Sequence, residues 1–256
     1  MRGVLFKGNR QAEVQQFPDP HAGPGEAVVK IRASGLCGTD LHRYRASEPT
    51  GMITGHEPCG VIAELGPGAP AALKIGGRVM VHHYAGCAIC EICAMGYEQL
   101  CPHGHVTFGG GTGHGANADF ILVPARTLVR LPDELSFEEG AAISCGIGTA
   151  WNGLKKMDVS GRDTVAVFGQ GPVGLSGTLS AKAMGSRVIA VDVVPERLAL
   201  AKGLGADCVI NGREADPVAA IRELTGGPGA SASCLRRLSS SGWPRASSST
   251  TTVKAG

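Results

Sequence analysis

Residues 164–174 read TVAVFGQGPVG, an apolar run rich in valine that ends in a Gly-x-Gly-x-x-Gly turn. A helix-forming stretch follows to about Gly185, and residues 187–192, RVIAVD, form a second apolar run that closes on an acid. Strand, glycine turn, helix, strand and terminal acid in this order are typical of a dinucleotide-binding βαβ unit. The order predicts a parallel sheet with flanking helices, an α/β architecture.

The glycine turn indicates how a dinucleotide would bind. Glycines let the pyrophosphate approach the backbone at the positive end of the helix. The acid that closes the second strand would accept the ribose hydroxyls and repel a 2′-phosphate, which favours NAD over NADP; a nearby arginine leaves that preference open. The predicted cofactor-binding residues are Gly169, Gly171, Pro172, Val173, Gly174, Asp192 and Arg197.

Downstream, the alternation of strands and helices continues and then stops. A helix from Glu196, a strand at residues 208–210 and a helix at residues 217–224 complete three strands with their crossovers. Residues 229–256 hold eight serines and three threonines, with no acid and no periodic apolar pattern. We therefore predict a partial NAD-binding domain at 151–228 and a low-complexity tail at 229–256, which would leave the first strand as an exposed sheet edge.

Upstream, residues 1–150 contain many short β-prone runs, at residues 3–6, 27–31, 60–66, 78–82 and 119–123, separated by glycine and proline turns. This pattern predicts an all-β, barrel-like domain. Near its end, Ser136 and Glu139 have the spacing of a capping box and predict the start of a helix. That helix leads to Cys145, just before a glycine-containing segment, a position from which a side chain can point into a pocket.

Four cysteines lie close together between the predicted strands. Cys87, Cys90 and Cys93 follow one another at Cys-x2-Cys spacing, and Cys101 comes seven residues later. This spacing lets four thiolates converge on one tetrahedral zinc ion, and such a closed site has a structural role. We predict a structural zinc lobe at 86–102. The alternative is four unrelated buried cysteines.

A second metal-type pattern lies further upstream. Residues 35–42 read GLCGTDLH and residues 55–57 read GHE. Together they offer a thiolate, an imidazole and carboxylates, which suit zinc, and a site with three protein ligands keeps one position open to polarise a substrate oxygen. Thr39 and His42 are close enough in sequence to act as proton-transfer groups.

Composition excludes several classes of function. Residues 1–228 carry 20 basic and 22 acidic residues, and the overall charge of +2 comes from four basic residues in the tail, so nucleic acid is not an expected partner. No signal-peptide pattern or membrane-length apolar run is present. Nine cysteines without a secretory context favour metal chemistry over disulfides and a cytoplasmic location.

Some conspicuous residues receive no role. Residues 109–111, Gly-Gly-Gly, are predicted to form a mobile loop rather than a phosphate cradle, because no helix follows them. Cys59 and Cys208 are interpreted as small core hydrophobes. Several histidines could approach the pocket or the cysteine lobe, but glycine-rich loop residues are more often solvated, and none is assigned a role: His82, His83, His103, His105 and His114.

Taken together, these motifs resemble the zinc-dependent medium-chain alcohol dehydrogenases, the medium-chain dehydrogenase/reductase family, over residues 1–230. The resemblance implies a GroES-like catalytic domain followed by a Rossmann domain. It implies that Cys37, His56 and Cys145 bind the catalytic zinc, with Glu57 as an alternate ligand or a neighbour of the site. Asp40 would orient the imidazole of His56. Some family members use a carboxylate as third ligand, which keeps Glu138 and Glu139 as alternatives.

The resemblance also implies a reaction. Hydride would pass from a secondary alcohol or polyol to NAD(P), with Thr39 accepting the alcohol proton and His42 passing it to solvent. Two zinc ions per chain, one catalytic and one structural, are expected. Family members form homo-oligomers, but the region of their dimer contact is absent from this chain.

The sequence departs from the family pattern after Gly229, where an acid and a β-branched strand are expected and Ser231-Ala-Ser-Cys-Leu-Arg-Arg stands instead. We interpret this as a truncated or frameshifted reading frame that lacks the second Rossmann half. An alternative function is therefore a catalytically impaired zinc-binding fragment. A third, a zinc-free quinone reductase of the same superfamily, would leave the thiolate and histidine ligands without a purpose.

Overall fold

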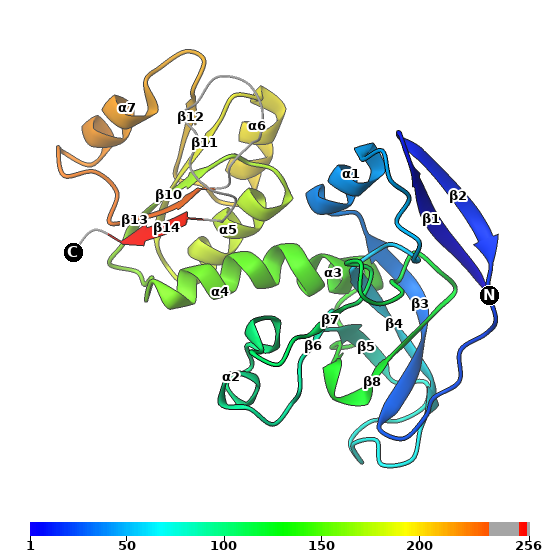
Figure 1. Ribbon diagram of the computed structural model, residues 1–256. Coiled ribbons are helices and arrows are strands. Elements are labelled where there is room, and N and C mark those ends of the chain that lie inside the picture. Colours follow the sequence, from blue (N-terminus) through cyan, green and yellow to red (C-terminus); the bar gives the residue numbers. More distant parts are fainter. Residues whose placement is uncertain (236–250, 255–256) are drawn as a thin grey trace. The chain divides into compact units, whose positions relative to one another are not determined.

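The computed structural model describes residues 1–235 and 251–254 and divides into two compact units (Figure 1). The first unit spans Met1–Cys145 and the second spans Gly146–Gly256. The division thus falls a few residues before the predicted boundary at residue 150. Within the described residues, no helix combines the length and apolar character needed to cross a membrane.

The first unit is built on a five-stranded antiparallel sheet with the order β8-β3-β4-β5-β9. These strands are β8 (Phe120–Pro124), β3 (Glu26–Gly35), β4 (Glu57–Leu65), β5 (Arg78–Val81) and β9 (Leu128–Arg130). Two smaller pairs accompany the sheet: β1 (Arg2–Gly8) with β2 (Gln11–Gln16), and β6 (Tyr84–Ala85) with β7 (Val106–Thr107). The predicted runs at residues 3–6, 27–31, 60–66, 78–82 and 119–123 all fall on or beside strands, while β2, β6, β7 and β9 were not predicted.

Buried and partly exposed side chains alternate along the strands of this sheet. In β5, Val79 and Val81 are buried while their neighbours are only partly so, and in β8 the buried residues are Ile121 and Val123. These side chains point to one face and form a single core with Val29 and others. Period-two burial of β-branched residues is what a half-buried antiparallel sheet requires.

Three α-helices belong to this unit: α1 (Gly38–Arg45), α2 (Glu91–Ala94) and α3 (Phe137–Ala142). The predicted capping box is present at the start of α3, because Ser136 Oγ accepts from Glu139 N at 3.1 Å and Ser136 N donates to Glu139 Oε2 at 2.7 Å. These contacts satisfy backbone groups that the first turn of a helix leaves unpaired. A π-helical turn, η3 (Ile143–Ile147), follows directly.

The second unit contains a sheet with the order β12-β11-β10-β13-β14. Its strands are β10 (Thr164–Phe168), β11 (Arg187–Asp192), β12 (Cys208–Asn211), β13 (Ala232–Leu235) and β14 (Thr251–Lys254). The first four are parallel, and β14 is antiparallel to β13. Its helices are α4 (Gly148–Lys156), α5 (Pro172–Ala183), α6 (Pro195–Gly203) and α7 (Pro217–Leu224).

Strand β13 corrects two predictions. The segment 229–256 was predicted to lie outside any domain, but residues 232–235 pair in parallel with β10 and residues 251–254 pair with β13. For the same reason β10 is not an exposed edge. The physical reason is that an unpaired edge of β10 would present a row of free N–H and C=O groups. Such an edge can pair even with a segment that contains few strand-forming residues. Residues 236–250 and 255–256 of the predicted tail lie outside the described residues.

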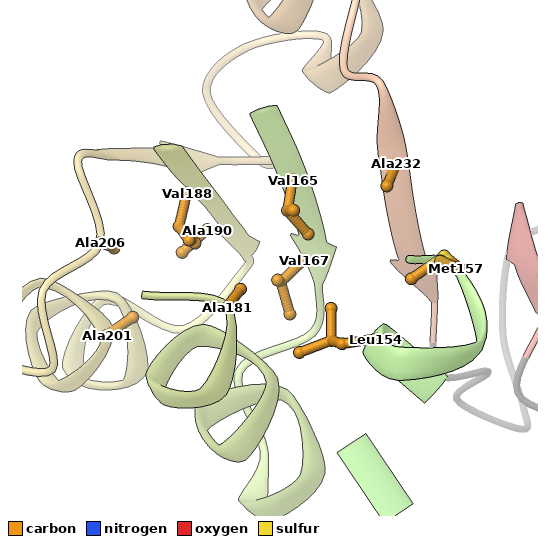
Figure 2. Packing of buried hydrophobic residues seen from close by; sticks show 10 residues of the cluster. All are labelled: Leu154, Met157, Val165, Val167, Ala181, Val188, Ala190, Ala201, Ala206 and Ala232. Carbon is orange, nitrogen blue, oxygen red and sulfur yellow. The ribbon is translucent and has the colours of Figure 1, made fainter. Parts of the chain in front are cut away.

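The main core of the second unit lies between the sheet and its helices. Figure 2 shows Val165 and Val167 of β10 and Val188 and Ala190 of β11 directed toward the helices. Leu154 of α4 packs against them, as do small residues of α5 and α6. The alanines allow helix and strand backbones to approach closely. This packing fixes the position from which α5 begins.

The turn between β10 and α5 depends on one close backbone contact. Gly169 has a φ of +82°, a conformation that favours glycine. A Cβ added at Gly174 would lie 1.7 Å from the carbonyl oxygen of Gly169, whereas a Cβ at Gly177, in the same helix, would meet only a side-chain methyl at 3.6 Å. Helix α5 can therefore pack against the turn at Gly169 because Gly174 has no side chain.

This contrast gives a matched pair of variants. Gly174→Ala should lower the free energy of unfolding of the second unit by about 2 kcal/mol or more, because backbone must move. Gly177→Ala should stay within about 1 kcal/mol of the wild type, since alanine favours a helix. Neither tryptophan of the chain falls within residues 1–145, and Trp151 lies in α4, so urea unfolding followed by tryptophan fluorescence reports on the second unit. Equal midpoints for the two variants would contradict this account.

Candidate metal centres and dinucleotide turn

The first unit gathers four potential metal ligands from three segments. Cys37, His56, Glu57 and Cys145 each offer one ligand atom, and these atoms all lie within 4.8 Å of one another. We call this set the Cys37 cluster. The predicted third position is thus filled by Cys145, and the described residues show no cluster that includes Glu138 or Glu139. Two sulfurs, an imidazole nitrogen and a carboxylate form a donor set that suits zinc.

Asp40 joins two of these segments. Cys37 is the N-cap of α1, and its backbone N donates to Asp40 Oδ2 at 2.9 Å. The other oxygen, Oδ1, lies 3.2 Å from Nδ1 of His56. Asp40 is only 1% exposed. One buried carboxylate therefore both starts the helix beside Cys37 and orients His56, so that a proton on Nδ1 leaves the Nε2 lone pair for a metal.

Glu57 reaches the cluster because Gly35 has no side chain. The two residues pair across β3 and β4. A Cβ at Gly35 would lie 1.9 Å from Glu57 Oε2, so any larger residue there would displace the carboxylate. The glycine before Leu36 and Cys37 in the sequence is thus a spatial requirement of the cluster.

Cys145 is presented by the π-helical turn η3, a type of irregularity often found at functional sites. The preceding residue, Ser144, donates its hydroxyl to the carbonyls of Pro58, at 3.0 Å, and of Gly140, at 3.1 Å. Gly140 lets α3 approach β4, since a Cβ there would lie 2.4 Å from Cys59 Sγ. Ser144 thereby fastens the turn beside Glu57, a role that the sequence analysis missed.

Charges in the cluster favour a cation. The hydrogen bond with the Cys145 thiol, together with those from His56 and Thr39, lowers the pKa of Cys37 to about 2, while the same contact raises the pKa of Cys145 above its usual range. Burial opposes protonation of His56, but hydrogen bonds with Asp40 and Cys37 outweigh it and raise its pKa to about 10. Burial and the negative charge of Cys37 raise the pKa of Glu57. Without metal, the site holds protons where a divalent ion would otherwise sit.

The two predicted proton-transfer residues differ in position. Thr39 Oγ1 lies 3.4 Å from Nε2 of His56, at the cluster. His42 lies one turn further along α1 and is exposed, and no hydrogen bond joins it to the cluster among the described residues. The structure thus brings Thr39, but not His42, into direct contact with the candidate ligands.

His83, to which the sequence analysis gave no role, is buried beside the cluster. Its ring centroid lies 5.1 Å from that of His56 and 4.2 Å from that of Tyr84. Burial and the charge of His56 lower the pKa of His83 to about 3, which keeps the imidazole neutral. The interpretation of His83 as a solvated loop residue is therefore wrong. The position of His83 beside His56 is a tertiary contact, and the local sequence gives no sign of it.

The four-cysteine cluster forms the second candidate metal centre. One ligand atom from each of Cys87, Cys90, Cys93 and Cys101 lies within 4.8 Å of the others. The Cys87–Cys93 and Cys90–Cys101 sulfur distances are both 3.9 Å. These separations are far longer than a disulfide bond and close to the edge of a tetrahedron, about 3.8 Å for Zn–S distances near 2.3 Å. Backbone N–H groups of Ile89 and Cys90 lower the pKa of Cys87 to about 6, which favours the thiolate.

The segment carrying this cluster is tied to the sheet domain by an ion pair. Glu98 Oε2 accepts from Gly86 N at 2.7 Å and lies 3.1 Å from the guanidinium of Arg126, which itself donates to the Gly86 carbonyl at 2.6 Å. Both polar groups of Gly86 are therefore fixed. Cys87 follows directly, so its position in the cluster is fixed as well.

In the second unit, the glycine turn leaves room where a phosphate would approach. No atom lies within 4 Å of a Cβ built at Gly171, the N-cap of α5, and Pro172 is the first residue of the helix. Asp192 closes β11 and is buried. Its carboxylate accepts from the backbone of Gln170, at 2.5 Å, and of Val193, at 2.7 Å. This ties the predicted acid directly to the turn.

The remaining predicted cofactor residues lie around this acid. Val173 and Gly174 are buried in the first turn of α5, so they shape the turn rather than face solvent. Arg197 Nη1 lies 3.9 Å from Asp192 Oδ2. The arginine and the acid therefore form an ion pair at the position that was predicted to contact the ribose.

A β domain with two groups of metal-type ligands, followed by a parallel sheet with a dinucleotide-type turn, defines a class of metal-binding oxidoreductases. Two family models match the chain: the alcohol dehydrogenase GroES-like domain over residues 23–133, and the zinc-binding dehydrogenase model over residues 172–236. The second match extends into the segment predicted to be a tail, in agreement with β13.

Individual relatives give the same picture. The chain is 40% identical to an uncharacterized zinc-type alcohol dehydrogenase-like protein, YphC, of Escherichia coli over 217 residues, which are 80% of this chain and 61% of that protein. It is 38% identical to an alcohol dehydrogenase of Geobacillus stearothermophilus over 88% of this chain and 67% of the relative. A crystal structure of an NAD-dependent alcohol dehydrogenase superposes with a TM-score of 0.82 at 33% identity, over 90% of this chain and 69% of the other.

The chain therefore belongs to the zinc-type alcohol dehydrogenase family. The predicted family and the predicted fold, a GroES-like domain followed by a Rossmann-type sheet, are confirmed. The chain spans 61% to 67% of the length of these two curated relatives.

The role of Asp40 can be tested by metal affinity. Asp40→Asn removes the charge that orients His56 and should weaken metal binding at the Cys37 cluster by about 10- to 100-fold. Asp40→Ala removes both acceptors and should weaken binding further. Chelator competition measures both effects, with the four-cysteine cluster as an internal reference and Asp133→Asn, at an exposed carboxylate, as a control. Unchanged affinity in Asp40→Ala would show that Asp40 does not position the cluster.

Proposed function

We propose that this chain is a zinc-dependent oxidoreductase that transfers hydride between a secondary alcohol or polyol and NAD. The observation that carries the proposal is the convergence of Cys37, His56 and Cys145, with Glu57, within 4.8 Å, in a chain whose second unit carries the dinucleotide turn. Zinc, held by the two sulfurs and the imidazole, would supply Lewis-acid polarisation of the substrate oxygen.

The chain's own residues would carry out the remaining tasks. Asp40 fixes the tautomer and orientation of His56. The Thr39 hydroxyl lies 3.4 Å from His56 Nε2, at the candidate ligands, and would accept the alcohol proton. His42, exposed on the same helix, would pass that proton to solvent. Neutral His83 beside His56 adds no competing positive charge.

The four-cysteine cluster would hold a second zinc ion with a structural role. Its four sulfurs leave no coordination position open. Such an ion can contribute roughly 10–16 kcal/mol of apparent binding energy to ordering the segment around it. Two zinc ions per chain are therefore part of the proposal.

A second candidate function is a zinc-binding fragment without turnover. The chain spans only 61% to 67% of the length of its curated relatives, which favours this alternative. In either case the metal sites are the same, so metal content and hydride transfer must be measured separately.

We expect the purified chain to contain about two zinc ions, and Cys37→Ser and Cys90→Ser each to lose about one. Zinc-loaded protein with NAD and a panel of secondary alcohols and polyols should form NADH, detected by its absorbance, and Cys37→Ser should abolish the reaction. Two zinc ions without any NADH formation would favour the fragment. Absence of zinc from the Cys37 cluster would contradict both candidates.

The coenzyme preference has its own test. We expect NADH to bind more tightly than NADPH by at least about tenfold, because a buried carboxylate repels a 2′-phosphate. Asp192→Asn keeps an acceptor for the backbone of the turn but removes the charge, and should reduce that preference. Fluorescence titration measures both affinities, with Asp207→Asn as the control. A preference for NADPH in the wild type would contradict the assignment of NAD.

A further inference from the structure

The glycine-rich segment around residues 109–115 is packed against the segment that leads through Gly55 and His56 into β4. A Cβ at Gly109 would lie 2.0 Å from the carbonyl oxygen of Gly55, and a Cβ at Gly115 would lie 2.3 Å from the same atom. Ala116 N also donates to that oxygen at 2.8 Å. The 109–115 segment therefore braces Gly55, next to His56.

Arg43 of α1 fastens the same segment from the other side. Its guanidinium donates to the carbonyl of Gly109 at 2.9 Å and also to that of Gly110. The side chain is part-buried, and its planar group engages two neighbouring carbonyls at once. Arg43 lies three residues after Asp40, so both side chains leave α1 on the same side of the helix.

The C-terminal end of α1, whose last turn carries Arg43, is also held by the turn between β1 and β2. Asn9 N donates to the carbonyl of Ala46 at 2.6 Å, and Arg10 N donates to that of Tyr44 at 2.8 Å. These contacts fix the C-terminal end of the helix to β1 and β2, while Asp40 ties its first turn to His56. The Arg43 contact adds a second tie between α1 and the His56 segment, because the 109–115 segment touches Gly55 directly.

We propose that Arg43 is a positioning residue that ties α1 to the 109–115 segment and thereby sets how long the Cys37 cluster retains its metal. Cys37 and Asp40 belong to the start of α1, while His56 belongs to the segment that leads from Gly55 into β4. Releasing Arg43 would let these two groups of ligands separate without removing any of them. The inference rests on the proposed metal site.

The test uses Co²⁺ in the full chain, because its absorption bands differ between a four-sulfur site and a mixed sulfur–nitrogen site. Release to a chelator is followed at each set of bands. Arg43→Met should release Co²⁺ from the Cys37 cluster about tenfold faster, at the lower end of the range for residues behind metal ligands. Arg43→Lys can donate to only one carbonyl, so its rate of Co²⁺ release should lie between those of the wild type and Arg43→Met. Release from the four-cysteine cluster should not change.

Two controls separate positioning from general destabilisation. Arg45→Met removes an exposed arginine from the same helix and should leave both rates unchanged. Gly109→Ala and Gly51→Ala introduce the same residue at nearly equal φ, +67° and +65°, but only the first collides with Gly55. Gly109→Ala should therefore speed release about tenfold, and Gly51→Ala should not. If Arg43→Met fails to fold, the comparison of Gly109→Ala with Gly51→Ala tests the inference instead.

Release rates for Arg43→Met and Gly109→Ala within twofold of the wild type would overturn the inference and leave the proposed function standing. If the wild type bound Co²⁺ only at the four-cysteine cluster, the proposed function would fail, and the inference with it. Equal acceleration at both clusters would also overturn the inference, because it would indicate loss of the fold rather than loss of position.

Discussion

The two hydrogen bonds of the Asp40 carboxylate are the constraint on which the first unit's site depends. A buried charge is costly unless its oxygens are paired, and here one oxygen caps the helix that begins at Cys37 while the other orients His56. Formation of α1 and assembly of the ligands are therefore one event. A short polar helix with little tendency to form alone gains stability from the cluster, and the cluster gains geometry from the helix.

The same site depends on residues that have no side chain. Gly35 leaves space for the Glu57 carboxylate, and Gly140 lets the helix before Cys145 approach β4. Gly55 and Gly109 bring two backbones into contact beside His56. In the second unit, Gly174 allows α5 to rest on the turn after β10. These glycines thus allow backbone segments to approach one another closely. Each close approach fixes the position of a candidate functional group.

How much of this could be predicted depended on whether the signal was local. Strands β10 and β11 and helix α7 were predicted to the residue, because apolar periodicity and glycine or proline at the ends agree there. Helix α1 was missed, since it has a single buried residue, Asp40, and no apolar face. The ligand residues followed from spacing and resemblance. Ser144, Arg43 and the buried position of His83 did not, because their contacts join residues that lie far apart in the sequence: 86 positions for Ser144 and Pro58, 66 for Arg43 and Gly109, and 27 for His83 and His56.

Strand β13 was missed because its sequence, ASCL, contains none of the β-branched or aromatic residues that are enriched in strands, and this matters for the second unit. With β13 beside β10, strand order reverses at β10: β11 and β12 lie on one side and β13 on the other. Dinucleotides bind at such a switch point, outside the carboxyl ends of the strands. The turn at residues 169–174 leaves β10 at that end, so the pyrophosphate position and the switch point coincide. Without β13, the turn would stand at a sheet edge. With it, the turn stands where the strand order reverses, and that is the position at which doubly wound sheets bind a dinucleotide.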